Sequence, residues 1–476
     1  MTAKKESGAG ESRLSMERKM IWETATKQQH SEIEDISGQY MEFITKAKTE
    51  RMSTDIIVEM LDKEGFKRME DIKKAAPGTR AYMINRGKNV AAFILGKEDI
   101  TNGVNLVASH SDAPRLDLKQ NPLYEDVDTK LALLKTHYYG GIKKYQWVNI
   151  PLAIHGKVIL DSGKEVDIHI GESAGDPVFT ICDLLPHLYR KKQAERKLME
   201  GITGEELNVL LASLSHSDKK SKKKVKLWVL EYLHKEYGMV EEDFVSAELE
   251  VVPAGPAREV GFDRSMIGAY GQDDRICAFT SVKALLEIRN PRRTAMALVI
   301  DKEEIGSDGP TSIKSRFLEE VFSSILELED PDYPDRKLRQ ALSNTKAISS
   351  DVNGAVNPSF KQVHELQNAA RMGLGICVTK YTGSGGKYSS NDASAEFMGL
   401  IRKTLNSAKV PWQTGEMGKV DEGGGGTIAK FLAEHNMDVV DAGPALLSMH
   451  SPMEISSKAD VWATFKAYRA FYNMKI

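Results

Sequence analysis

The sequence predicts an α/β fold, a three-layer α/β/α unit with a mostly parallel sheet and an inserted β-rich domain. Short, continuously apolar runs of strand length recur along the chain, which is typical of strands buried on both faces of a parallel sheet. Segments with helical spacing of apolar residues separate these runs and would cover both faces of the sheet. The stretch from about 118 to 262 departs from this alternation and predicts the insertion.

The composition is that of an ordinary globular protein. Its 476 residues include 65 Lys and Arg against 68 Asp and Glu, a formal net charge of −3. A nearly neutral chain lacks the net positive charge that would attract nucleic acids or anionic membrane surfaces. No apolar run approaches the roughly 20 residues that are needed to cross a bilayer. The N-terminal residues are polar, unlike a secretory signal, and three scattered cysteines form no disulfide framework. We therefore expect a cytoplasmic enzyme without nucleic-acid or membrane partners.

The N-terminal part predicts an arm followed by two helices. Residues 1–18 contain few apolar side chains and predict a flexible arm. Apolar residues at helical spacing predict helices over 37–50 and 55–66, and Ser-Thr-Asp at 53–55 is a typical N-cap signal for the second.

The rest of the main unit alternates strands with helices. The apolar runs predict strands at 90–95, 105–109, 294–300, 346–350 and 438–440. The covering helices are expected over 275–289, 311–328, 391–407 and 427–435. The main, catalytic domain is then split, with residues 19–117 before the insertion and 263–476 after it.

The inserted domain, 118–262, is expected to be β-rich. Strand-like runs at 150–154, 157–160 and 166–170 precede a helical, lysine-rich piece at about 183–237. The lysines of this piece have no interleaved aromatic residues or arginines for contacts with bases, so a solvated surface explains them better than a nucleic-acid site.

Polar motifs follow several of the predicted strands, where sites form in open parallel sheets. The motifs contain His110 and Asp112, Glu303 and Glu304, Asp351, His450, and the pair Asp273-Asp274 before a helix. Each alone has a structural explanation, such as a hydrogen-bonded histidine, a solvated acid pair or a helix cap. Together, converging imidazoles and carboxylates would need a compensating cation, so the set predicts a metal site.

These motifs resemble those of the aspartyl aminopeptidase family of dizinc metallopeptidases, most closely its bacterial branch. The matching stretches, in the family's order, are HSDAPRLDLK (110–119), GQDDR (271–275), DKEEIG (301–306), SSDVNGAVNP (349–358) and MHSPMEI (449–455). The resemblance implies an aminopeptidase that removes the N-terminal residue of peptides, preferring Asp or Glu. It also implies two zinc ions per subunit, whose places cobalt or manganese could also take.

The resemblance implies five metal ligands: His110, Asp273, Glu304, Asp351 and His450. Asp273 would bridge the ions, the first of which also takes His110 and Asp351, while the second takes the other two. Metal ions paired in this way lie about 3.5–4 Å apart and hold a hydroxide between them. On composition alone Asp274 could equally be the bridge; Asp273 is preferred because the family's bridge is the first residue of such a pair.

Two further residues receive catalytic roles from the resemblance. Glu303 would be the general base that takes a proton from the metal-bound water and delivers it to the leaving amine, a contribution of about 10²–10⁴-fold. Asp112 would orient the imidazole of His110 and raise its basicity. Residues two apart on an extended segment point to the same side, so this placement is reasonable.

The substrate pocket is expected near 378–391, which resembles a family stretch with a lysine followed by a basic-Tyr pair. Lys380 is the preferred partner for an acidic substrate side chain, Lys387 the reserve candidate, and Tyr388 a wall or hydrogen-bond donor. Glycines at 383–386 depart from the family's pattern, so an ordinary glycine-rich loop is an equal alternative.

Assembly is the last expectation drawn from the resemblance. His187 resembles an insertion-domain histidine that reaches a partner subunit's active site, although a plain surface or core histidine fits equally well. The family forms large, hollow, dimer-based homo-oligomers, which would admit short peptides only. Two alternatives stay open: a dimetal aminopeptidase of broader or leucine-type specificity, and a catalytically silent assembly protein, which would lack a ligand or Glu303.

Overall fold

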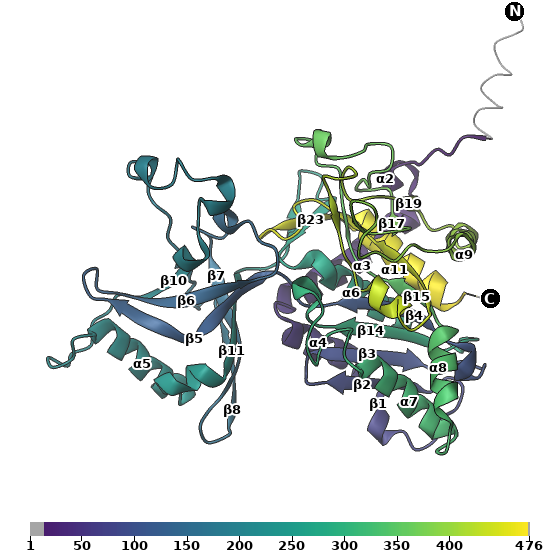
Figure 1. Cartoon of the computed structure of the whole chain (residues 1–476), viewed down its shortest axis with the longest axis horizontal. Helices are drawn as coiled ribbons and strands as arrows, with labels where there is room; N and C mark the ends of the chain where they lie inside the picture. The colour runs from purple at the N-terminus through teal and green to yellow at the C-terminus, as the bar shows by residue number, and fades with distance from the viewer. Residues whose placement is uncertain (1–13, 475–476) are drawn as a thin grey trace, which may run out of the picture.

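The computed structural model of this chain describes residues 14–474, which form two lobes built on separate sheets. The larger lobe, with both ends of the described chain, lies to the right in Figure 1, and the smaller β-rich lobe lies to the left. The predicted arm, 1–18, lies mostly outside the described residues. Within these residues, no helix is both long and apolar enough to cross a membrane.

The larger lobe contains a mostly parallel sheet, as predicted. Its order is β1-β2-β3-β14-β4-β15-β21-β17-β19, with β4, β14, β15 and β21 forming a parallel centre. The strands are β1 (Lys67–Arg68), β2 (Arg80–Asn85), β3 (Asn89–Ile94), β4 (Asn105–His110), β14 (Ala295–Ile300), β15 (Lys346–Ser349), β17 (Ile376–Thr379), β19 (Trp412–Thr414) and β21 (Asp438–Gly443). The central strands β4 and β14 are buried at every residue, which explains their continuously apolar sequence.

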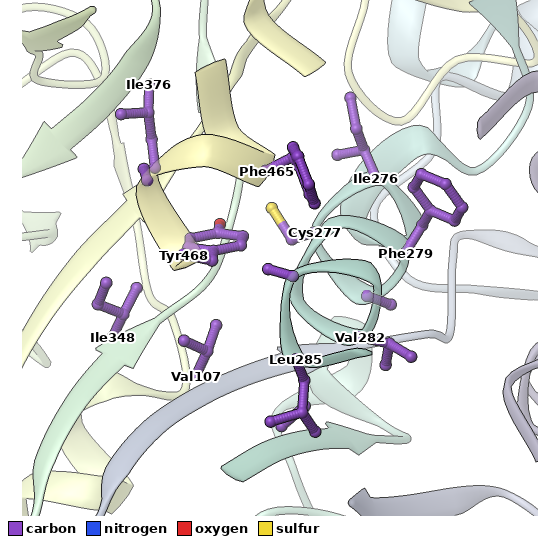
Figure 2. Packing of buried hydrophobic residues seen from close by; sticks show 14 of the residues in the cluster. Val107, Ile276, Cys277, Phe279, Val282, Leu285, Ile348, Ile376, Phe465 and Tyr468 are labelled. Atoms are coloured by element: carbon purple, nitrogen blue, oxygen red, sulfur yellow. The ribbon is translucent and has the colours of Figure 1, made fainter. Parts of the chain in front are cut away.

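Helices cover both faces of this sheet and complete the predicted three layers. One face carries α2 (Ile21–Thr24), α3 (Lys27–Lys46), α4 (Glu50–Lys63), α6 (Gln272–Leu286), α9 (Ala395–Ser407) and α11 (Lys458–Tyr472). The other carries α7 (Phe317–Glu329), α8 (Asp335–Ser343) and α10 (Ala429–Ala433). Figure 2 shows the first face, where Leu285 of α6 and Tyr468 of α11 lie near Val107 of β4 and Ile348 of β15. This packing fixes the helix that carries Asp273 against the strand that carries His110.

The β-rich lobe is an antiparallel sheet in the order β8-β7-β11-β5-β6-β10-β9. Its strands are β5 (Arg115–Asp126), β6 (Leu131–Tyr139), β7 (Leu152–Ile159), β8 (Glu165–Ile170), β9 (Thr180–Ile181), β10 (Asn208–Ala212) and β11 (Ala247–Pro253). One helix, α5 (Lys224–Tyr237), packs Val225 and Val229 into the core of this lobe.

Small sheets connect the remaining segments around the strand ends of the larger lobe. They consist of β12 (Arg258–Val260), β13 (Met266–Ala269) and β23 (Glu454–Ser457); β16 (Asn353–Gly354) and β22 (Ala445–Leu446); and β18 (Gly383–Ser384) and β20 (Gly424–Gly425). The last pair joins the two glycine-rich segments of the chain, with Gly383 opposite Gly425 and Ser384 opposite Gly424.

Several predicted boundaries are wrong. The first helix begins at Lys27 rather than 37, because Thr26 and Gln29 form a capping box. The second begins at Glu50, where the Thr49 hydroxyl accepts the Met52 N–H at 3.2 Å, and Ser53, taken for part of the cap, is buried inside the helix. In the insertion, the predicted helical piece at 183–237 is helical mainly over α5; short 3-10 turns and the strand β10 precede it.

Candidate metal centre

The centre lies at the carboxyl ends of three neighbouring strands. His110 is the last residue of β4, the turn with Glu303 and Glu304 follows β14, and Asp351 follows β15. Since β14 and β15 both pair in parallel with β4, their carboxyl ends lie at one edge of the sheet. His110, the turn with Glu304 and Asp351 are far apart in the sequence, but they lie close together because their strands are adjacent, as expected for an open α/β sheet.

Two further segments complete the cluster. Asp273 and Asp274 lie at the start of α6, with non-helical backbone angles and a cis peptide bond between them. His450 lies in the loop before β23, with φ +64°. Asp273 and Asp274 are buried, whereas His450 is half-buried, and all five predicted ligands line one cavity.

Asp273 lies between the two histidines. Its Oδ1 is 3.4 Å from His110 Nε2, and its Oδ2 is 3.2 Å from His450 Nε2. The same His450 nitrogen is 3.3 Å from Glu304 Oε1. Each oxygen of a single carboxylate thus faces a different imidazole, the arrangement that a bridging ligand requires.

The other ring nitrogen of each histidine is held by a backbone carbonyl. His110 Nδ1 lies 3.0 Å from the carbonyl oxygen of Asp112, and His450 Nδ1 lies 3.1 Å from that of Gly141. A carbonyl only accepts, so Nδ1 carries the proton in each ring. Nε2 of each ring is then the nitrogen that would offer its lone pair to a bound metal ion, the tautomer that ligating histidines adopt.

Two overlapping groups have ligand atoms close enough to share an ion. His110 joins Asp273 and Glu304 in one group, and Asp274 and Asp351 in the other. Asp274 Oδ2 also accepts the backbone N–H of His110 at 3.3 Å. Asp273 and Asp274 therefore both lie at the centre. The sequence left open which of them would be the bridging ligand, and the structure places both carboxylates near His110.

The charge of the cluster favours a bound cation. Burial, together with neighbouring carboxylates, raises the pKa of Asp274, Glu304 and Asp351 above the usual range. Burial also opposes ionisation of Asp273, but its two histidine contacts hold the pKa of that carboxyl below its usual value. Within the described residues, the buried oxygens Asp273 Oδ1, Asp274 Oδ1 and Glu304 Oε1 have no hydrogen-bond partner. A divalent ion with nitrogen and oxygen ligands fits these unsatisfied atoms.

Glu303 and Asp112 have different positions in the centre. Glu303 lines the cavity without belonging to either ligand group, and burial, with Glu304 and Asp112 nearby, raises its pKa to about 8. Asp112 is fully buried, with Oδ1 3.2 Å from His110 Nδ1. It accepts the backbone N–H groups of Glu303 and Glu304 at 3.1 and 3.2 Å, so one carboxylate orients the histidine and the acidic turn.

Glu454 is a residue of the centre that the sequence reasoning missed. Its Oε1 accepts the backbone N–H of His450 at 2.7 Å, and its Oε2 accepts that of Asp273 at 3.1 Å. This glutamate belongs to the MHSPMEI motif, but only the structure shows that it binds the backbone of both ligand-bearing segments.

The centre opens into a cavity of about 430 Å³. The paired glycine segments, β18 and β20, line it together with Lys387, Lys419 and Lys430. Lys380 and Tyr388 are not among its lining residues: Lys380 Nζ binds Asp392 at 2.7 Å, and the Tyr388 side chain is exposed. Lys387 Nζ binds the same Asp392 at 2.8 Å, so two ammonium groups share one carboxylate beside the cavity.

His187 lies far from these residues in the fold. It is exposed in the β-rich lobe, shortly before the 3-10 turn Tyr189–Lys191, and it does not line the cavity of its own chain.

An α/β sheet whose strand ends gather histidines and carboxylates around an open cavity defines a metal-dependent hydrolase. Residues 43–472 match the family described as Aminopeptidase I zinc metalloprotease (M18). The chain belongs to this family and is a metallo-aminopeptidase.

Individual relatives agree over nearly the whole chain. A protein of Thermotoga maritima named "Probable M18 family aminopeptidase 1" is 52% identical over 96% of this chain and 99% of its own. The crystal structure of a Thermotoga maritima M18 aminopeptidase superimposes with a TM-score of 0.93 at 51% identity, covering 97% of this chain and 100% of that one. The structure of aminopeptidase I from Clostridium acetobutylicum gives 0.91 at 46% identity, with the same coverage.

Proposed function

We propose that this metallo-aminopeptidase holds two zinc ions per chain and uses Glu303 as its general base. The observation that supports two ions most directly is Asp273, whose two oxygens face His110 and His450 separately. The first ion would take His110, Asp273 and Asp351, and the second Asp273, Glu304 and His450. We keep Asp273 as the bridge because Asp274 Oδ2 already accepts the His110 backbone N–H.

Zinc in such a pair supplies Lewis acidity for the substrate carbonyl and lowers the pKa of water. Glu303, at the cavity wall, would take a proton from the attacking water and deliver it to the leaving amine. Asp112 would keep His110 in the Nδ1-protonated tautomer and hold the Glu303 turn in place, through the hydrogen bonds described above.

Metal analysis tests the two-ion assignment. Mass spectrometry of zinc-supplied protein should give two zinc ions per chain, and Asp273→Asn should lower that number. Asp274→Asn is the matched control, because it makes the same chemical change one residue away. Two ions retained in Asp273→Asn, with loss in Asp274→Asn, would transfer the bridge to Asp274.

We propose a preference for peptides with N-terminal Asp or Glu, supported by the lysines around the cavity. Lys387 lines it directly, and Lys380 and Lys387 together outweigh the single charge of Asp392. Tyr388, exposed beside Lys387, would border the substrate once it is bound. The broader or leucine-type specificity has its own support in Met417, Phe431 and Met449, which also line the cavity. Assays with Asp-, Glu- and Leu-anilides side by side separate the two, and faster turnover of Leu-anilide would refute the acidic preference.

We also propose that residues 118–262 form an oligomerisation domain inserted between 19–117 and 263–476. The β-rich strands run from Arg115 to Pro253, and this lobe exposes large apolar side chains on one connected stretch: Leu184, Leu185, Leu188, Leu198 and Met199. His187 lies within that stretch and would reach a partner subunit's centre in a dimer-based homo-oligomer that admits short peptides. The cytoplasmic location stays a prediction.

Subunit mixing tests the shared centre. Glu303→Gln and His187→Ala should each be inactive alone, whereas oligomers reassembled from both should regain activity, because some centres then combine Glu303 of one chain with His187 of another. Full activity of His187→Ala alone, or no recovery on mixing, would refute the role of His187.

A further inference from the structure

The short segment Tyr139–Gly141, at the end of strand β6, contacts the metal centre at several points. Tyr139 belongs to the β-rich sheet, yet its hydroxyl donates to Asp112 Oδ2 at 2.7 Å. Two residues later, the carbonyl of Gly141 accepts from His450 Nδ1 at 3.1 Å. Both imidazoles of the centre are therefore oriented, directly or through Asp112, by residues that the β-rich sheet delivers.

Space between these contacts is tight. Gly140 has φ +72°, and a Cβ there would lie 3.3 Å from Pro114 and 3.4 Å from the Cβ of Glu304. Glycine at this position lets the chain pass beside the ligand turn and bring Gly141 to His450. The segment thus fits closely against the centre over all three residues.

The ring of Tyr139 is held from its other side by Arg115. These two residues are partners in the β5–β6 register, and the guanidinium lies 3.9 Å from the ring centre. Arg115 is buried and bound in turn to Glu250, at 3.2 Å, and to Glu50 of helix α4, at 3.6 Å. An ion network shared by the two lobes therefore fixes the direction in which the Tyr139 hydroxyl points.

Asp112 depends on this hydroxyl. Its carboxylate is fully buried beside His110 Nδ1, and besides that ring it accepts three donors: the backbone N–H groups of Glu303 and Glu304, and the Tyr139 hydroxyl. Tyr139 is the only one of the three whose donor is a side chain. Without it, the two backbone groups of the acidic turn alone would set the angle at which Asp112 meets His110.

We propose that Tyr139 is a positioning residue for the metal centre: its hydroxyl fixes Asp112, and through Asp112 it orients His110 and the Glu303–Glu304 turn. The β-rich lobe then has a second task besides assembly, because it completes the orientation of the ligands within its own chain. Partners that orient metal ligands typically contribute about 10–100-fold in metal affinity or activity, and Tyr139 acts one contact further out, so we expect the lower end.

The test compares Tyr139→Phe with Tyr138→Phe. The two tyrosines are neighbours on β6, but Tyr138 faces outward with 42% of its surface exposed. Tyr139→Phe keeps the ring over which Arg115 lies, and circular dichroism checks that it folds. We expect about a tenfold loss of zinc affinity, measured on metal-free protein by chelator competition, and a similar fall in kcat at nearly constant KM. Tyr138→Phe should match the wild type in all three.

A second comparison isolates the route through Asp112. Adding Tyr139→Phe to an Asp112→Asn protein should change zinc affinity less than twofold, because the hydroxyl acts on a carboxylate that is no longer there. Wild-type zinc affinity in Tyr139→Phe, or an undiminished tenfold effect in the Asp112→Asn background, would overturn the role of Tyr139. Since this role rests on the proposed metal centre, wild-type protein that binds no zinc, or whose zinc content is unchanged by His110→Ala, would overturn both.

Discussion

Replacing Glu303 and its neighbour Glu304 by glutamine should separate catalysis from metal binding. The two changes are chemically identical and lie one residue apart in the same turn, Glu303–Ile305. Both keep the backbone N–H groups that bind Asp112, so the turn itself should persist. The side chains differ in position: Glu304 Oε1 lies 3.3 Å from His450 Nε2 and belongs to a ligand group, whereas Glu303 lines the cavity outside both groups.

The expected magnitudes follow from these positions. General acid–base groups contribute about 10²–10⁴-fold, so Glu303→Gln should lower kcat by that factor, or about 2.7–5.4 kcal/mol in activation free energy at about 1.36 kcal/mol per tenfold. Its zinc content should stay at the wild-type value. Glu304→Gln removes a charged ligand from a buried site, and we expect zinc affinity at that site to fall by at least about a hundredfold.

The assay pairs steady-state turnover of an aminoacyl anilide with zinc analysis of the same samples. Activity in Glu303→Gln above about a tenth of the wild type would refute its role as general base. Loss of zinc from Glu303→Gln, or unchanged zinc affinity in Glu304→Gln, would show that the two roles are assigned to the wrong residues. Addition of excess zinc is the control, since it should restore activity in part to Glu304→Gln and not to Glu303→Gln.

Three further predictions concern stability and specificity. Removing zinc with a chelator should lower the thermal midpoint, because zinc at a hundred times its dissociation constant stabilises the folded state by about 2.7 kcal/mol; equal midpoints with and without zinc would contradict a zinc site of that affinity. Leu285→Ala, in the fully buried core at the far end of α6 from the centre, should lower the free energy of unfolding by about 2–5 kcal/mol in chemical denaturation, whereas Leu366→Ala on an exposed loop should lower it by less than about 0.5 kcal/mol. Lys387→Ala should reduce kcat/KM for Asp-anilide by about 10- to 150-fold while sparing Leu-anilide, because it removes one charge-assisted contact of roughly 1.5–3 kcal/mol. Lys403→Ala, on the exposed side of α9, should leave both rates unchanged, and an equal loss for both anilides in Lys387→Ala would remove its role in specificity.

The strands were predictable from the sequence because burial on both faces leaves a local signature. The runs at 90–95 and 105–109 appear in the structure as β3 and β4, within a residue or so of the expected bounds. The polar residues after these strands were predictable as a site because binding sites in open parallel sheets form at the carboxyl ends of the strands. Helix starts were less accurate, although the Thr26–Gln29 capping box is itself readable as a Thr-x-x-Gln pattern.

The insertion was harder to predict because its composition is ambiguous. A lysine-rich stretch with scattered leucines satisfies helical spacing over 183–237, yet only about its last quarter forms the helix α5. The residues before it form turns and the strand β10, which pairs with β6 more than 70 residues earlier in the chain. Pairing with a distant strand overrides a weak local preference, and no local pattern records it.

The sequence by itself determined the kinds of element, the residue types that gather at the strand ends and the family to which the chain belongs, since periodicity and residue type are local properties. The tertiary structure alone decided which atoms meet: the two oxygens of Asp273 with two different histidines, Lys387 rather than Lys380 at the cavity, and Gly141 with His450, 309 residues away. The physical reason is that these contacts depend on which strands pack side by side and how far each side chain reaches. Neither is encoded by neighbours along the chain.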